Sequence, residues 1–198
     1  MNARAQRIVT TAIDLAEKGG FEAVRLRDVA SEADVALGTL YRYFRSKEDL
    51  LIAALTMEVE QLEARLEGRV PGGDTPTERV TGFFRGATRG LCRRPRLARA
   101  ILRAAASGDH ELAEKVASFH SHMMALIVAA TRGQAFGSTN GTPAFDDGTR
   151  EGEVASLLQD IWFAALVGWA GGLKTQSEVI EQMGTATGLL LAHLEDSH

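Results

Sequence analysis

The spacing of apolar residues constrains the fold of this chain most. Over long stretches they recur every three or four residues, which is the period of an amphipathic helix, and alternating β-branched runs are missing. Glycine, proline or polar clusters interrupt the pattern at 19–20, 71–76, 95 and 107–108. The sequence therefore predicts an all-α protein of about nine helices. They are expected over 3–18, 26–33, 37–44, from Ser46 to Leu66, and over 76–92, 95–107, 109–132, 153–171 and 176–194.

The composition is that of a folded globular protein, with 45% hydrophobic and 24% charged residues. One cysteine, Cys92, excludes an internal disulfide and a cysteine-rich metal site. The first residues lack the apolar core of a signal peptide, and the longest nearly apolar run, 161–173, is too short to cross a bilayer. We therefore expect a soluble, cytoplasmic protein.

Charge is segregated along the chain, although the net charge is only −4. Residues 79–108 contain eight arginines and no acidic residue, whereas residues 146–198 are strongly acidic. The arginines form either a solvated surface, paired in part with the acidic segment, or a site where an anionic ligand group meets Arg93, Arg94, Arg96 or Arg99. We predict a small N-terminal domain over 1–48 and a larger C-terminal domain over 49–198.

Residues 26–44 have the pattern of a helix-turn-helix. Two short helices flank a turn of about three residues, and Val29, Ala30 and Leu40 are spaced to pack the two helices together. The outer face of the second helix is then left with hydroxyl, aromatic and cationic groups suited to duplex DNA: Leu37, Thr39, Tyr41, Arg42 and Tyr43. Gly38 would let the backbone approach the duplex closely. The alternative is a helical hairpin that contacts no DNA.

The stretch from Leu26 to Leu51, with its G-T-L-Y-x-Y-F-x-S-K-x-x-L-L pattern, resembles the DNA-binding domain of the TetR family. Within that family it is similar to KstR-type sterol-catabolism repressors. The resemblance implies that Thr39, Tyr41 and Tyr43 meet bases and phosphates and that Lys47 binds a phosphate. Arg25 departs from the family, which often has a capping serine or threonine there, and we expect it to reach a phosphate instead.

The last two predicted helices are candidates for a homodimer interface. Small residues recur every fourth position at Ala164, Gly168 and Gly172, and again at Gly184 and Gly188, which lets helices approach closely. Ile180 and Leu191 are among the large residues that flank them. The resemblance implies a four-helix interface with a partner, and a dimer would read a palindromic DNA operator. Alternatively, both stripes pack inside one chain.

The C-terminal domain is the candidate site for a small-molecule effector. The resemblance implies a repressor that such a molecule releases from double-stranded DNA, and the KstR-type likeness implies an apolar or acyl-type effector such as a coenzyme A thioester. The residues expected to line the site are aromatic, thioether, aliphatic or cationic: Phe83, Leu91, Arg93, Arg94, Phe119, Met123, Met124, Ile127, Trp162 and Trp169. The alternative is that these residues are ordinary core, as such residues more often are.

Catalytic patterns are weak in this sequence. His120 and His122 lie two residues apart and would face different sides of a helix, and no cluster of metal-binding spacing accompanies them. We predict no catalytic residue, no metal, no cofactor and no membrane partner, and thus a transcriptional regulator rather than an enzyme. The alternative is a ligand-binding or catalytic helical bundle with a vestigial DNA-binding module.

Overall fold

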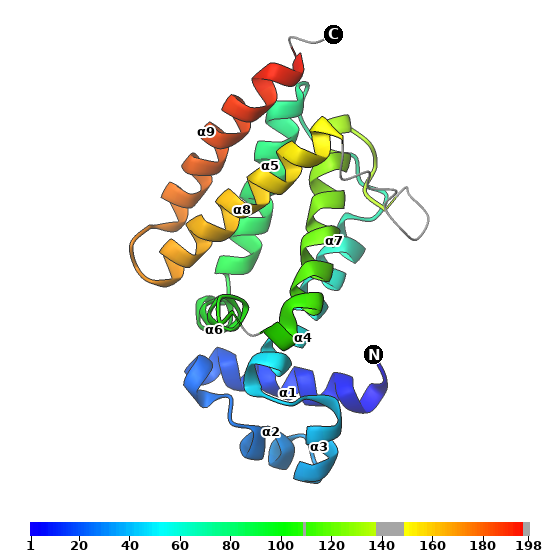
Figure 1. The fold of residues 1–198 in the computed structure, drawn as a ribbon, viewed down its shortest axis with the longest axis vertical. Helices are drawn as coiled ribbons and strands as arrows, with labels where there is room; N and C mark the ends of the chain where they lie inside the picture. Colours follow the sequence, from blue (N-terminus) through cyan, green and yellow to red (C-terminus); the bar gives the residue numbers. More distant parts are fainter. Residues whose placement is uncertain (109, 138–148, 196–198) are drawn as a thin grey trace. The chain divides into compact units, whose positions relative to one another are not determined.

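The computed structural model of the chain describes residues 1–108, 110–137 and 149–195. This part consists of nine α-helices and two short 3-10 helices, without a strand (Figure 1). The prediction of an all-α fold is confirmed. None of the helices in these ranges combines the length and hydropathy needed to cross a membrane.

The helix bounds follow the sequence signals closely. The elements are α1 (Ala3–Gly19), η1 (Phe21–Ala23), α2 (Leu26–Glu32), α3 (Leu37–Tyr43), α4 (Lys47–Leu66), α5 (Pro76–Cys92), α6 (Pro95–Ala105), η2 (His110–Leu112), α7 (Ala113–Arg132), α8 (Arg150–Ala170) and α9 (Gln176–Glu195). Two expected helices differ. The one expected over 109–132 is divided into η2 and α7. The one expected from 153 begins at Arg150, because Thr149 caps it by accepting a hydrogen bond from the N–H of Gly152.

The chain folds into two compact units. The first unit comprises Met1–Val59 and Arg93–Phe119, and the second comprises Glu60–Cys92 and His120–His198. The helices α4 and α7 each contribute to both units. The predicted domain boundary after residue 48 stays a prediction.

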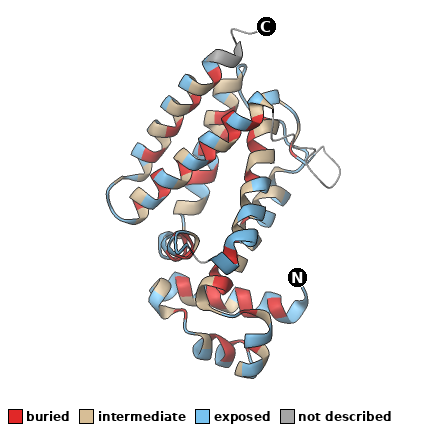
Figure 2. Ribbon diagram, viewed as in Figure 1, coloured by how far each residue is buried: buried red, intermediate tan, exposed pale blue. Residues whose placement is uncertain are grey.

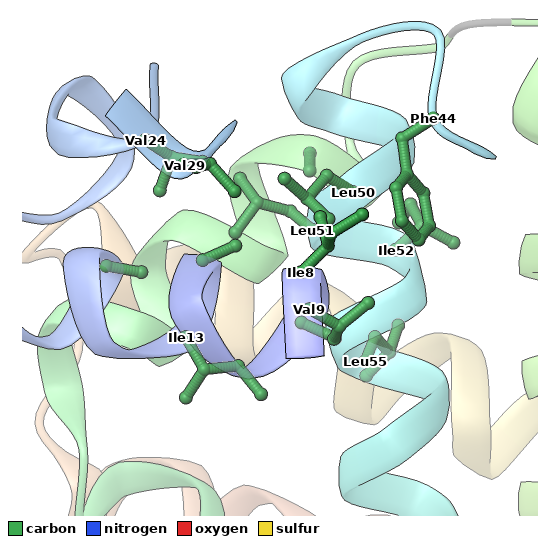
Figure 3. Packing of buried hydrophobic residues seen from close by; sticks show 14 of the residues in the cluster. Ile8, Val9, Ile13, Val24, Val29, Phe44, Leu50, Leu51, Ile52 and Leu55 are labelled. Atoms are coloured by element: carbon green, nitrogen blue, oxygen red, sulfur yellow. The ribbon is translucent and has the colours of Figure 1, made fainter. Parts of the chain in front are cut away.

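The core of the first unit is built around α1. Its buried face, which includes Ile8 and Val9, packs against Leu50 and Leu51 of α4 (Figure 3). Val24, Val29 and Phe44 extend this cluster toward the short helices, and Leu97 and Ile101 bring α6 into it. The short helices α2 and α3 are therefore fixed by tertiary packing, since helices of seven residues are not stable alone.

The second unit is organised by α5, α8 and α9, where α9 packs against both of the others. Along α9, one buried residue recurs every fourth position: Val179, Met183, Thr187 and Leu191. Phe84 of α5 and Trp162 of α8 place their ring centroids 5.6 Å apart. Figure 2 shows buried stripes along these helices.

Candidate nucleic-acid interface

The turn between α2 and α3 is closed by backbone hydrogen bonds. The N–H of Ala33 donates to the carbonyl of Val29 over 2.9 Å, and the N–H of Val35 donates to that of Ala30 over 3.0 Å. Asp34 takes a left-handed φ of 51°, which aspartate tolerates better than most residues. Leu40 of α3 is fully buried in the core of the first unit. The two short helices therefore form a hairpin of fixed geometry.

The outward face of α3 carries Gly38, Tyr41 and Arg42. All three are exposed, and 51% of Tyr41 is accessible to solvent, which is high for an aromatic residue. Thr39 beside them is half-buried. No side chain shields the backbone at Gly38, since a Cβ added there meets nothing within 4 Å. The face thus offers a phenol, a guanidinium and open backbone for contact with a duplex.

The structure corrects the expected orientation of Leu37 and Tyr43. Both are partly buried and pack against the core of the first unit. They lie three residues before and after buried Leu40, and residues three apart share one face of a helix. The hydroxyl of Tyr43 accepts a hydrogen bond of 3.2 Å from Nδ2 of Asn2, so it reaches the surface at its tip.

The turn between α3 and α4 is held by two side chains. Oγ of Ser46 accepts a hydrogen bond of 3.0 Å from the N–H of Asp49, so Ser46 is the N-cap of α4. The buried carboxylate of Asp49 in return accepts one of 3.0 Å from the N–H of Arg45 and forms an ion pair with Lys115. The residues that precede α4 are therefore fixed against the first turn of α4.

Lys47, expected to bind a phosphate, lies in a contact of its own unit. Its Nζ is 3.9 Å from the ring centroid of Phe21 and 3.6 Å from the carboxylate of Glu22. Arg103 approaches the same ring at 4.1 Å and pairs with Glu22 at 2.9 Å. Arg25 precedes α2 in an extended conformation and is exposed, and its side chain makes no capping hydrogen bond. Phosphate contacts by Lys47 and Arg25 stay predictions.

Several arginines of the 79–108 segment have structural partners. Arg94 forms ion pairs with Glu58 and, at 2.8 Å, with Glu17. Partial burial lowers the pKa of Arg94, but hydrogen bonds to these two carboxylates outweigh it and raise the pKa above its ordinary value. Arg96 donates to the carbonyl of Lys18. These contacts join the start of α6 to α1 and α4, so the partners lie in the first unit rather than in the acidic C-terminal segment.

The residues predicted to line an effector site are divided between the two units. Arg93, Arg94 and Phe119 belong to the first unit, and the others belong to the second. Trp162 is buried and donates from Nε1 to Oγ1 of Thr88 over 2.9 Å. The remaining second-unit members are buried or half-buried: Phe83, Leu91, Met123, Met124, Ile127 and Trp169. Their role in ligand binding stays a prediction.

The predicted dimer residues do not form one surface. Leu191 is fully buried, and a Cβ at Gly184 would lie 3.7 Å from Thr81, because this side of α9 packs onto α5. Gly172 lies after the end of α8 and takes a φ of 79°, so it is a turn residue rather than part of a helical stripe. Ala164 is exposed. Gly168, Ile180 and Gly188 are half-buried.

Other residues of α8 and α9 are exposed and apolar. They include Leu157, Val167 and Leu189, with exposed fractions of 50%, 38% and 69%. The small-residue spacing that predicts an interface includes none of these three residues. In the ranges that the structure describes, no group of three or more histidine, cysteine or acidic residues is arranged to hold a metal ion.

Comparison with known proteins agrees with this architecture. Residues 8–54 match the family model for bacterial regulatory proteins of the tetR family, and residues 73–190 match that for the tetracyclin repressor-like C-terminal domain. The HTH-type transcriptional repressor KstR of Rhodococcus jostii is 36% identical over 188 residues, which are 95% of this chain and 82% of that protein.

Solved structures give the same picture. A TetR transcriptional regulator from Rhodococcus sp. RHA1 superposes with a TM-score of 0.79 at 28% identity, covering 99% of this chain and 98% of that one. FadR from Bacillus subtilis, solved in complex with stearoyl-CoA, shares the fold with a TM-score of 0.65 at 19% identity, covering 93% and 96% of the two chains. The chain belongs to the tetR family of bacterial regulatory proteins.

Proposed function

We propose that this protein is a transcriptional repressor that binds its operator through α3. The observation that carries the proposal is the exposed face of α3, where Tyr41 and Arg42 project from a helix whose other side is buried through Leu40. A helix of this kind fits the major groove, and its flanking cations suit phosphates. The repressor role is supported by the similarity to KstR over 95% of this chain. Such a role is regulatory rather than catalytic, and it places the protein in the cytoplasm with the DNA.

A dimer on a palindromic operator is part of the same proposal, because one short helix contacts too few base pairs for useful specificity. The exposed apolar residues Leu157, Val167 and Leu189, together with exposed Ala164, form the contact surface that we propose. Buried Leu191 is left out of it. Burial of this surface against a second copy would remove apolar area from water, which favours association.

Footprinting of the region upstream of the gene tests the proposal. The expected result is two protected half-sites about one helical turn apart, related by a dyad. Light scattering during gel filtration tests the dimer with Ala164→Glu, which buries a charge in the proposed interface, against Ala64→Glu on an exposed face of α4. We expect only Ala164→Glu to give monomers and to lose the footprint. Protection of a single half-site by a stable monomer would contradict the proposal.

The effector that we propose is a small apolar or acyl-type molecule, of which coenzyme A thioesters are the first to test. Support comes from the shared fold of FadR from Bacillus subtilis, whose structure contains stearoyl-CoA. A ligand releases the repressor only if it binds the DNA-incompetent conformation more tightly. Titration of the protein–operator complex with stearoyl-CoA should lower the fraction bound, whereas free coenzyme A should not. Equal effects of both compounds would contradict an apolar effector.

A further inference from the structure

A cavity of about 510 Å³ lies in the second unit, beside the end of α4. Its apolar wall is formed by aliphatic and aromatic side chains from α4, the following linker, α5 and the segment after α7: Leu62, Leu66, Val70, Pro71, Phe83, Ala87 and Phe136. Cavities of roughly 300–1,000 Å³ hold small-molecule ligands in proteins. The volume is therefore sufficient for an organic ligand.

Among the residues that the structure describes, the charged ones that line this cavity are all arginines, namely Arg65, Arg69 and Arg79, and none of this lining is acidic. The side chain of Arg79 is held by hydrogen bonds to the backbone. Its Nε donates to the carbonyl of Ala130 over 3.0 Å, and its two other nitrogens donate to those of Thr131 over 2.8 Å and Asp74 over 3.1 Å. It thereby satisfies carbonyls at the end of α7 and fixes the linker before α5.

Arg65 and Arg69 differ from Arg79 in this respect. Both are exposed, and neither forms an ion pair with any residue that the structure describes. They stand four residues apart on either side of the end of α4 at Leu66. Two guanidinium groups beside an apolar cavity, with no acidic partner among the described residues, favour an anionic ligand group, since arginine forms bidentate hydrogen bonds with carboxylates and phosphates.

Backbone contacts hold the wall that carries Arg69. The N–H of Gly68 donates to the carbonyl of Phe136 over 2.9 Å, and the N–H of Phe136 donates to that of Arg69 over 3.0 Å. The ring of Phe136 lies with its centroid 6.1 Å from that of Phe83. These hydrogen bonds and the ring contact hold the backbone of Arg69 next to the apolar wall of the cavity.

Two glycines inside α5 leave the cavity open. Gly82 and Gly86 both line it, four residues apart on one helix face. A Cβ at Gly86 would meet nothing within 4 Å, so close helix packing does not require glycine there. Glycine within a helix destabilises the helix relative to alanine. The space beside Gly86 is therefore part of the cavity that a ligand can enter.

We propose that this cavity binds a small amphipathic anion, with its apolar body against Phe83, Phe136 and Leu66 and its carboxylate or phosphate at Arg65 and Arg69. This site deepens the effector part of the proposed function and rests on it for its regulatory meaning. Its existence is tested without DNA, so a failure of the site and a failure of operator binding give different results.

Calorimetric titration of the full chain with octanoate, octyl phosphate and 1-octanol tests the site. We expect both anions to bind more tightly than the neutral alcohol. A preference for one anion identifies the head group as a carboxylate or a phosphate. Arg65→Gln with Arg69→Gln should weaken anion binding at least about tenfold, a change typical of losing charge-assisted hydrogen bonds, and should leave 1-octanol unaffected. The matched pair Arg85→Gln with Arg89→Gln removes the same charge from exposed positions of α5 that do not line the cavity.

A second pair of variants tests the space itself. Gly86→Leu places a side chain in the cavity and should abolish binding of all three probes. Gly90→Leu changes another exposed glycine of α5 where a Cβ also meets nothing, outside the cavity lining, and should bind as the wild type does. Circular dichroism confirms that both variants are folded. Absence of anion binding to the wild type would overturn the proposal, and so would anion binding unchanged by the arginine pair or by Gly86→Leu.

Discussion

Replacing Thr88 with valine should destabilise the second unit by about 2 kcal/mol. Thr88 is fully buried on α5, and its Oγ1 accepts the hydrogen bond from Nε1 of Trp162. Valine has nearly the same shape as threonine but no acceptor, so the indole N–H is left buried without a partner. This perturbation separates the hydrogen bond from packing, because the volume of the core hardly changes.

The expected magnitude follows from the cost of an unsatisfied buried donor. A net hydrogen bond contributes about 0.5–1.5 kcal/mol, and an orphaned buried polar group costs about 1–3 kcal/mol. In a protein of this size about 2 kcal/mol lowers the melting temperature by roughly 4–8 °C. Trp162→Phe removes the donor and also shrinks a ring that packs on Phe84, so it should cost more than the hydrogen bond alone.

Urea unfolding followed by tryptophan fluorescence measures these effects. The chain has two tryptophans, Trp162 and Trp169, and both report on the second unit. In the Thr88→Val and Trp162→Phe double variant, the total cost should be smaller than the sum of the single costs by about 1 kcal/mol or more. Thr185→Val, on an exposed position of α9, is the control and should change stability by less than about 0.5 kcal/mol. Additive single costs would refute the buried hydrogen bond.

Three further changes probe other parts of the chain. Ser46→Ala removes the N-cap of α4 and should cost the first unit about 1 kcal/mol in unfolding followed by circular dichroism, whereas an unchanged midpoint would exclude the cap. Asp34→Ala should cost about 1–2 kcal/mol at its left-handed φ, while Asp34→Gly should cost nothing, and equal losses would contradict the turn geometry. Burial lowers the pKa of His120, and Asp160 opposes this only in part, so the unfolded chain takes up the proton more readily. The contribution of neutral His120 to stability is therefore fully present above about pH 6.5, and the melting temperature should fall as the pH is lowered below that value. His120→Gln should make this fall in melting temperature smaller.

The helices of this fold were predictable because their signals are local. Apolar spacing, the glycines at 19–20 and the N-cap at Ser46 act within a few residues, and the structure has helix ends there. The inward packing of Val29 and Leu40 follows from the same period. The tetR-type pattern over residues 26–51 identified the family in the same local way.

Pairings between distant residues could not be predicted. Arg94 pairs with Glu17 and Glu58, which are far from it in sequence. The sequence contains many other arginines and acidic residues, and nothing in it distinguishes which of them form pairs. Gly184 resembles an interface residue until its packing toward Thr81 of α5 is known. The cavity lined by Arg65, Arg69 and Phe136 likewise depends on contacts between separate segments, and no periodic pattern marks it.

Operator binding by Tyr41→Ala tests the central claim most directly. Fluorescence anisotropy would compare a labelled duplex from the gene's upstream region with a shuffled duplex of the same composition. We expect the wild type to prefer the upstream duplex with an affinity that falls as salt rises. Tyr41→Ala should lose that preference while keeping its fold, and Arg89→Ala, an exposed change on α5, should keep it. Equal binding of the two duplexes by the folded wild type, or full preference in Tyr41→Ala, would contradict the role of α3.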